Sequence, residues 1–260
     1  MAWVVSIVMF ACGAMPSVVD DDPAPAARPV ADFLVIPLRL HVLTAEGMPE
    51  VDCKLSDEDL KRILRKVNRI WHKAGIHWGL EAIIREPAAR LDRFREAPAG
   101  RSLTRFRLLA PDASRKTDGL HVFYLHDLPV NGVWMGTNFA LVRETASLRQ
   151  VEGGIDEPIP RVTAHELGHA LGLQHRQDRT NLLASGTTGT SLNEAEIETA
   201  RRRARSIPGS LTVESLEQAA AKAETGRAKT LHGWLAEIPG AEARAAALLK
   251  QLESTTGGDR

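Results

Sequence analysis

The chain has 260 residues, 43% of them hydrophobic, which is enough for one domain of ordinary size with additions or for two small domains. Its 33 basic and 33 acidic residues balance to a net charge of zero. Bulk charge therefore gives no case for nucleic acid or an anionic membrane surface as a partner.

The N-terminal segment differs from the rest of the chain, because its first 19 residues contain no charged side chain. An apolar stretch followed by small residues is typical of a secretory signal, so we assign residues 1–18 to a signal peptide or membrane anchor and expect an exported protein. Gly13 and Pro16 favour a cleaved signal over a retained anchor, although 19 uncharged residues approach the length that spans a bilayer. Cys12 raises a lipoprotein alternative, which the bulky Phe10 weakens because a small residue is expected there.

Residues 19–34 are rich in Asp, Pro and Ala and predict a disordered linker. This segment is too short for a folded prodomain. If the leader is removed, Cys53 is the one remaining cysteine, so the fold does not depend on an intramolecular disulfide. We expect Cys53 to be a small buried or loop residue.

Two strands are predicted in the next part of the chain, at residues 35–44 and 76–85. In the first of them, apolar residues alternate with Arg39 and His41. A period of two residues is typical of a strand with one buried and one solvent-exposed face, so we expect a half-buried strand.

A helix is predicted between these two strands. Ser56 is a suitable N-cap, and Asp59 occupies the capping-box position three residues later. Apolar residues then recur at helical spacing as far as Ala74, and Gly75 ends the helix. The helix therefore packs one apolar stripe on the sheet.

Residues 87–118 are polar, rich in arginine and irregular, and they predict an insertion or long loop. Residues 120–125 predict a strand, and residues 132–143 predict one or two short strands. We expect His121 and His126 to be sheet-surface or loop residues, because neither has metal-ligand spacing to another histidine.

The stretch from His165 to His175 reads H-E-x-x-H-x-x-G-x-x-H. His165 and His169 are four residues apart, so on a helix their side chains lie on one face and can share a metal. Glu166 can reach a water on that metal without being a ligand. Gly172 can end the helix in a left-handed conformation and so bring His175 back as a third ligand. Three nitrogen ligands leave a fourth tetrahedral position open, as in catalytic zinc sites.

This run of residues resembles the zinc-binding signature of the metzincin metallopeptidases. The resemblance implies an α+β fold with a twisted mixed sheet, two main helices and a small C-terminal helical subdomain. It also implies a zinc-dependent endopeptidase that hydrolyses peptide bonds in a peptide or protein substrate. Carried over by position, His165, His169 and His175 ligate Zn²⁺ and Glu166 is the general base. We expect a monomer with no nucleic-acid partner, which contacts a membrane only through an N-terminal anchor.

The resemblance also implies an edge strand, just before the signature helix, that pairs with the extended substrate. Residues 133–134 and residues 140–142 are the two stretches that fit this role by strand addition. An ordinary sheet element explains either stretch equally well.

The sequence departs from the family at the Met-turn, a turn whose methionine lies beneath the zinc. The matching segment, Thr180 to Gly186, has Leu183 at that position, and all five methionines lie upstream. Leucine in place of methionine conserves volume and usually costs under about 1.5 kcal/mol, so we expect zinc binding to survive. A tyrosine that serves some members as an extra ligand is also absent, since the sole tyrosine is Tyr124.

The signature lies within a predicted catalytic domain of residues 35–206, whose last helix begins at an Asn193 cap and extends to about Arg205. Residues 207–260 form a C-terminal helical extension. We expect it to be a helical cap on the domain or, alternatively, an interaction or autoinhibitory tail. Its predicted helices lie near residues 213–224, 228–237 and 241–253.

Two other functions remain open. The first is a zinc-binding pseudoenzyme that binds peptides without cleaving them. The missing methionine is its support, and the intact Glu166 argues against it. The second is a non-peptidase zinc hydrolase on the same scaffold. No residue pattern defines a specificity pocket, so the sequence predicts the chemistry better than the substrate.

Overall fold

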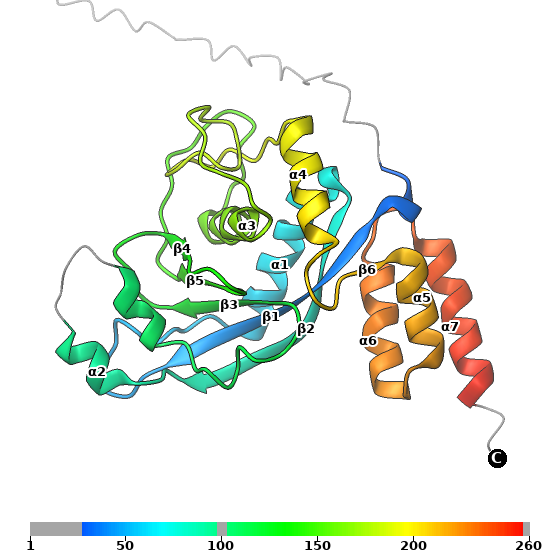
Figure 1. Cartoon of the computed structure of the whole chain (residues 1–260), viewed down its shortest axis with the longest axis horizontal. Helices are drawn as coiled ribbons and strands as arrows, with labels where there is room; N and C mark the ends of the chain where they lie inside the picture. Colours follow the sequence, from blue (N-terminus) through cyan, green and yellow to red (C-terminus); the bar gives the residue numbers. More distant parts are fainter. Residues whose placement is uncertain (1–27, 98–102, 257–260) are drawn as a thin grey trace, which may run out of the picture.

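The computed structural model describes residues 28–97 and 103–256 (Figure 1). This part of the chain forms one mixed sheet with helices on both faces. The strands are β1 (Leu34–Thr44), β2 (Ile76–Pro87), β3 (Leu120–Leu125), β4 (Gly132–Trp134), β5 (Phe139–Arg143) and β6 (Leu211–Thr212). The helices are α1 (Asp57–Trp71), α2 (Leu91–Glu96), α3 (Pro158–Ala170), α4 (Glu194–Ala204), α5 (Val213–Lys222), α6 (Thr225–Ala236) and α7 (Glu242–Thr256).

The sheet has the order β2-β1-β3-β5-β4, and β6 pairs with the start of β1. The pairs β1–β2, β1–β3 and β3–β5 are parallel, whereas β4 pairs with β5 in the antiparallel direction. The predicted α+β class, with a twisted mixed sheet and two main helices, is therefore confirmed (Figure 1). The order also places β5 inside the sheet and β4 at its edge.

Helix α1 begins as predicted from its capping residues. The Ser56 side chain accepts a hydrogen bond from the backbone N–H of Asp59, and the Asp59 carboxylate accepts one from the backbone N–H of Ser56. Gly75 ends the helical segment with a φ of 64°, which is strained for residues with a side chain. Both ends of this helix are thus determined by residues close in sequence.

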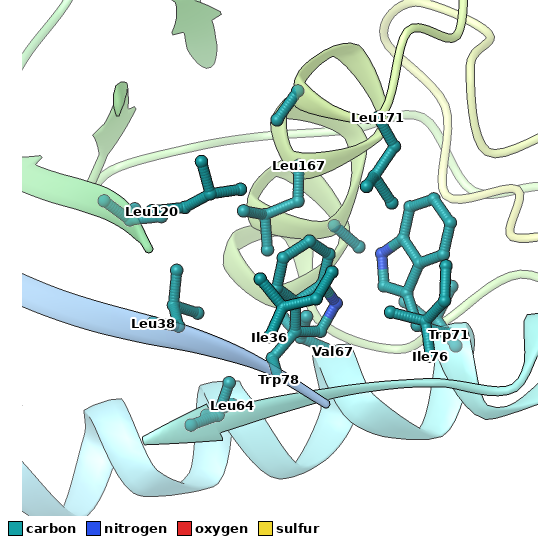
Figure 2. Close-up of a cluster of buried hydrophobic side chains, with 14 of the residues drawn as sticks. Ile36, Leu38, Leu64, Val67, Trp71, Ile76, Trp78, Leu120, Leu167 and Leu171 are labelled. Atoms are coloured by element: carbon teal, nitrogen blue, oxygen red, sulfur yellow. The ribbon is translucent and has the colours of Figure 1, made fainter. Parts of the chain in front are cut away.

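The main hydrophobic core lies between the sheet and helices α1 and α3. Figure 2 shows Leu167 and Leu171 at the end of α3 among the side chains of Trp71 and Ile36. Nearly all of α3 is buried, so its orientation is determined by packing on both sides. This packing holds the segment that carries the signature motif.

Strand β1 differs from the prediction of a half-buried strand. It lies in the middle of the sheet, and His41 is fully buried on the face that was expected to contact solvent. Val35 and Leu43 on this second face pack into two further hydrophobic clusters. The alternating pattern could not reveal this, because the covering residues come from distant parts of the chain.

The segment predicted as an irregular loop at residues 87–118 contains ordered structure. Strand β2 extends to Pro87, and helix α2 and a 3₁₀ helix at Leu103–Leu108 follow. Phe94 and Phe106 of these helices are buried against each other, with ring centroids 5.1 Å apart. The segment therefore covers part of the second face of the sheet, so it is an insertion with short helices and not an irregular loop throughout.

The helices predicted after residue 207 are confirmed as α5, α6 and α7. They pack on the second face of the sheet at the start of β1, around Phe33 and Val35 (Figure 1). The Trp234 indole lies against Gly79 of β2 and donates a hydrogen bond to the carbonyl of Leu80 at 3.0 Å. These helices therefore belong to the packed body of the protein.

The predicted leader at residues 1–18 lies outside the described residues, as does most of the predicted linker at 19–34. Residues 28–34 are described and belong to the fold, since Phe33 and Leu34 are buried and Val30–Asp32 forms a 3₁₀ helix. In the described part of the chain, no helix has the length and apolar character needed to cross a membrane.

Candidate metal centre

Helix α3 presents His165 and His169 on one face. The helix begins at Pro158, where a missing N–H costs no hydrogen bond, and its cap at Leu171 is followed by Gly172 with a φ of 83°. The backbone N–H of Leu173 then bonds the carbonyl of Gly168 at 3.0 Å and turns the chain back. This turn brings His175 toward the other two histidines.

The three histidines converge as the sequence predicted. Nε2 of His169 lies 3.1 Å from Nε2 of His165 and 3.1 Å from Nε2 of His175. Zinc–nitrogen bonds of about 2.0–2.1 Å in a tetrahedral site place ligand nitrogens roughly 3.3 Å apart. Among the described residues, this is the sole group of three or more histidine, cysteine or carboxylate side chains close enough to share an ion.

Hydrogen bonds to the outer ring nitrogens determine the protonation of two of these histidines. Nδ1 of His165 lies 2.8 Å from the carbonyl oxygen of Leu182, and Nδ1 of His169 lies 2.9 Å from that of Leu173. A carbonyl only accepts hydrogen bonds, so both Nδ1 atoms carry the proton and both Nε2 atoms keep a lone pair. Burial also lowers the pKa of His165 to about 3 and lowers the pKa of His169. The lone pairs of two neutral rings therefore face each other, an arrangement that fits a bound cation.

Glu166 lies beside these histidines and is 5% exposed. Burial raises the pKa of its carboxyl group to about 8, and the Trp134 backbone N–H and the Arg161 charge oppose this shift. A cation bound to the histidines would also lower the pKa of Glu166, because a nearby positive charge favours the carboxylate form. Gly132 of β4 makes room for the side chain, since a Cβ there would lie 2.9 Å from a carboxylate oxygen of Glu166.

The turn after the helix packs against α3 beside Gly168. Leu183 is fully buried, and a Cβ built on Gly168 of α3 would lie 3.3 Å from its Cδ1 atom. Asn181 holds this turn: its side chain accepts a hydrogen bond from the Leu183 N–H at 2.7 Å and donates one to Glu196 at 2.9 Å. The turn therefore places a buried, apolar leucine side chain against the helix that carries the histidines.

Sequence reasoning missed Arg161, which is 2% exposed and lies four residues before His165. Its guanidinium donates hydrogen bonds to the carbonyls of three residues of the following turn, Asn181, Ala184 and Gly189. The available signal was its position, because a residue four before His165 shares the face of α3 that carries the histidines. Its partners could not be inferred, since they lie some twenty or more residues later in the chain.

The centre opens into a cleft of about 790 Å³. All three residues of β4 line it, whereas β5 is paired on both sides and its residues do not line it. Of the two stretches considered for pairing with an extended peptide, residues 133–134 therefore remain. The apolar part of the lining comes from Leu103, Val130, Val133, Trp134, Leu148, Val162 and Leu173.

The other residues singled out in the sequence lie away from this centre. His121 is buried in the sheet, and His126 lies 3.0 Å from a carboxylate oxygen of Glu144. Cys53 is a free, buried thiol whose pKa burial raises to about 12, so it is protonated and unreactive. The prediction that Cys53 is a small buried residue is confirmed, whereas His121 is a core residue and not a surface one.

No protein-family model and no curated protein sequence matches this chain. Among solved structures, it is similar to an archaemetzincin from Methanopyrus kandleri, with 18% identity, a TM-score of 0.42, and coverage of 68% of this chain and 98% of that one. It is also similar to metalloproteinase-II from Bacteroides fragilis, with 13% identity, a TM-score of 0.39, and coverage of 65% and 53%. A chain in a chaperone–substrate complex has 14% identity and a TM-score of 0.39; the match covers 67% of this chain but 35% of that one.

Proposed function

We propose that this protein is a zinc-dependent endopeptidase in which His165, His169 and His175 hold Zn²⁺ and Glu166 is the general base. The observation that carries the proposal is the convergence of histidine lone pairs beside a buried carboxylate. The Nδ1–H groups of His165 and His169 donate hydrogen bonds to backbone carbonyls. These bonds turn the Nε2 lone pairs of both rings toward each other. Without a cation those lone pairs repel each other, so the arrangement favours metal binding.

A zinc ion at this point would polarise the scissile carbonyl and lower the pKa of water to roughly 7. Glu166 would accept the proton of the attacking water on a carboxylate oxygen. It then donates that proton to the nitrogen of the leaving amine, so the residue ends the cycle in the state in which it began. Burial strengthens the electrostatic interactions of the carboxylate during both proton transfers, because water does not screen its charge.

The edge of the sheet supports a substrate with an extended backbone. Gly132, Val133 and Trp134 all line the cleft, and β4 pairs with β5 on one side only. The Trp134 N–H is bonded to Glu166, so a peptide can add to the outer side of β4 through the remaining main-chain groups, with hydrogen bonds that do not depend on its sequence. Such binding uses an extended stretch of substrate chain, which supports an endopeptidase.

The test compares two identical substitutions on one helix. Glu166→Gln should keep stoichiometric zinc and lower the rate of casein cleavage by about 100-fold or more, the usual contribution of general base catalysis. Glu157→Gln at the other end of α3 should leave the rate unchanged, since Glu157 pairs with Arg62 and Lys66. Zinc content is measured by elemental analysis, and a chelator should abolish the wild-type activity.

Two outcomes would overturn parts of this proposal. Cleavage by Glu166→Gln at the wild-type rate would remove Glu166 as the base. Wild-type protein that binds one zinc but cleaves no member of a broad peptide library would favour the alternative, a binding protein without turnover.

The proposal also includes export of a monomer, which the apolar segment at residues 1–18 supports. Mass spectrometry of the protein isolated from cells distinguishes a cleaved, a lipid-modified and a retained leader. Gel filtration with light scattering measures the oligomeric state.

A further inference from the structure

Arg161 is a buried cation with no ion-pair partner among the described residues. Its side chain is 2% exposed, yet it belongs to the lining of the cleft. Burial of an unpaired charge is costly, so such a group calls for an explanation beyond packing. Glu166 is the sole other charged residue of the described lining besides the histidines, and it has its own role as the base.

The hydrogen bonds of Arg161 leave one nitrogen of its guanidinium without an acceptor. Nε donates to the carbonyl of Gly189 at 3.1 Å, and Nη2 donates to the carbonyls of Asn181 at 3.3 Å and Ala184 at 2.5 Å. These bonds occupy three of the five N–H groups that a guanidinium has. The two N–H groups of Nη1 remain.

The polar atom within hydrogen-bond distance of Nη1 cannot serve as its acceptor when a metal is bound. Nη1 lies 3.2 Å from Nδ1 of His165. A histidine that binds a metal through Nε2 carries its proton on Nδ1, and in His165 that proton points to the carbonyl of Leu182. The contact between Nη1 and Nδ1 is then one between two donors. The N–H groups of Nη1 therefore need an acceptor from outside the protein.

We propose that Arg161 makes the cleft selective for peptides that carry a carboxylate close to the metal. The inference rests on the proposed function, because the carboxylate belongs to the bound peptide. A carboxylate satisfies both N–H groups of Nη1 and neutralises the buried charge through charge-assisted hydrogen bonds. Leu148, Val162 and Ser185 line the same cleft and bring no competing charge.

The carboxylate has two possible sources with the same chemistry. An aspartate or glutamate side chain supplies it within a longer chain, and a free C-terminus supplies it at the end of a short one. A purely structural role for Arg161, that of holding the turn at residues 181–189, predicts no preference for either. A comparison of acid with amide peptides therefore separates recognition from structural support.

The experiment measures peptide binding to the zinc-loaded full chain with Glu166→Gln, which prevents turnover. The probes are amidated hexapeptides that contain one glutamate, moved through all six positions, each paired with its glutamine counterpart. A third series has glutamine and a free C-terminal carboxylate. Dissociation constants are obtained from fluorescence, since Trp134 lines the cleft. At one position we expect the acid to bind roughly ten-fold or more tightly than the amide.

Variants of Arg161 assign the preference to this residue. Arg161→Gln should abolish the acid preference, so that acid and amide peptides bind with equal affinity, and Arg161→Lys should keep part of it, because lysine keeps the charge but not the planar fork. Equal affinities for acid and amide at every position would overturn the proposal. A preference that persists in Arg161→Gln would also overturn it, since the metal would then bind the carboxylate. If Arg161→Gln loses zinc, Arg161→Lys provides the test. A weaker acid preference than in the protein with Arg161 supports the proposal, and an equal preference overturns it.

These binding constants do not depend on catalysis. An acid preference in a protein that cleaves no peptide would refute the proposed function and keep this inference. Cleavage of acid and amide peptides with equal affinity and rate would support the proposed function and refute this inference.

Discussion

Two groups of histidines in this protein have the same short distances and opposite chemistry. In the candidate metal centre the Nε2 atoms of His165 and His169 lie 3.1 Å apart. On the second face of the sheet, Nε2 of His41 lies 3.0 Å from Nδ1 of His121. Distance alone does not distinguish these two groups.

The pair on the sheet satisfies its own hydrogen bonds. Nδ1 of His41 donates to a carboxylate oxygen of Glu86 at 2.7 Å, which leaves Nε2 as an acceptor for the Nδ1 proton of His121. Nε2 of His121 lies 3.4 Å from both the hydroxyl and the carbonyl oxygen of Thr117, and it accepts from the hydroxyl when its Nδ1 carries the proton. Every proton in this series of hydrogen bonds has an acceptor, so no cation is needed.

The difference lies in what the second ring nitrogen binds. In the metal centre both Nδ1 protons point outward to backbone carbonyls, so two lone pairs point inward. In the sheet pair the rings donate in one direction, from His121 to His41 to Glu86. Two close histidines therefore predict a metal site only when their outer nitrogens are both donors.

The largest expected effect is the loss of metal on removal of one inward-facing ring. His169→Ala should lower the zinc affinity by more than about 100-fold, because loss of even an outer-shell partner costs 10–100-fold. His121→Ala is the matched control and should keep the zinc, at a cost of about 1–3 kcal/mol in the free energy of unfolding for the unsatisfied His41. Zinc titration and urea unfolding measure the two effects. A folded His121→Ala protein without zinc would refute the distinction.

The second expected effect is a loss of stability in acid caused by the sheet pair. Burial lowers the pKa of His41 and of His121 from 6.5 to about 4, with Arg39 adding to the shift of both. Between these values the unfolded chain binds more protons than the folded one, so the free energy of unfolding falls as the pH falls from 6.5 to about 4. One such shift corresponds to about 3 kcal/mol, and coupling makes the pair contribute less than twice that.

Urea unfolding at pH 7 and pH 4.5 tests this effect, with a chelator present so that metal release does not contribute. The double variant His41→Gln, His121→Gln should lose less stability between the two pH values than the wild type. His72 and His77 have lowered pKa values of about 4 and about 3 and contribute equally to both proteins. An unchanged pH dependence would show that the pair is not responsible.

The smallest expected effect concerns the turn that packs on α3 beside the candidate metal centre. Leu183→Met conserves volume at a fully buried position, so stability should change by less than about 1.5 kcal/mol. Zinc affinity should stay within a few-fold, because Leu183 holds the turn by packing and provides no ligand. Thermal unfolding and competition with a chromogenic chelator measure both quantities. A large gain in affinity would mean that methionine has a role beyond its volume.

Much of the fold was predictable where the determining residues are neighbours in the sequence. Ser56 and Asp59 define the start of α1, and Gly75 defines its end, all through local hydrogen bonds or backbone conformation. The burial of His41 was not predictable, since helices α5–α7 and the segment around Phe94 cover that face from far along the chain.

The candidate site divides in the same way. His165, His169 and His175 lie within one helical turn and its continuation, so their spacing was sufficient to predict that they meet. The role of Arg161 depends on carbonyls of residues 181–189, and the choice of β4 as the edge strand depends on strand pairing. Neither the role of Arg161 nor the edge position of β4 depends on a fixed spacing of residues, so a single sequence does not reveal them.

The contact between Trp234 and Gly79 has a consequence for any shortened form of the protein. A Cβ at position 79 would lie 2.4 Å from the indole ring, so α6 docks in space left by a missing side chain. A chain that ends before α5 would expose this stretch of backbone together with Phe33 and Val35. No described residue after Gly186 lines the cleft. The last fifth of the sequence thus adds no residue to the cleft, yet it covers apolar side chains of the sheet.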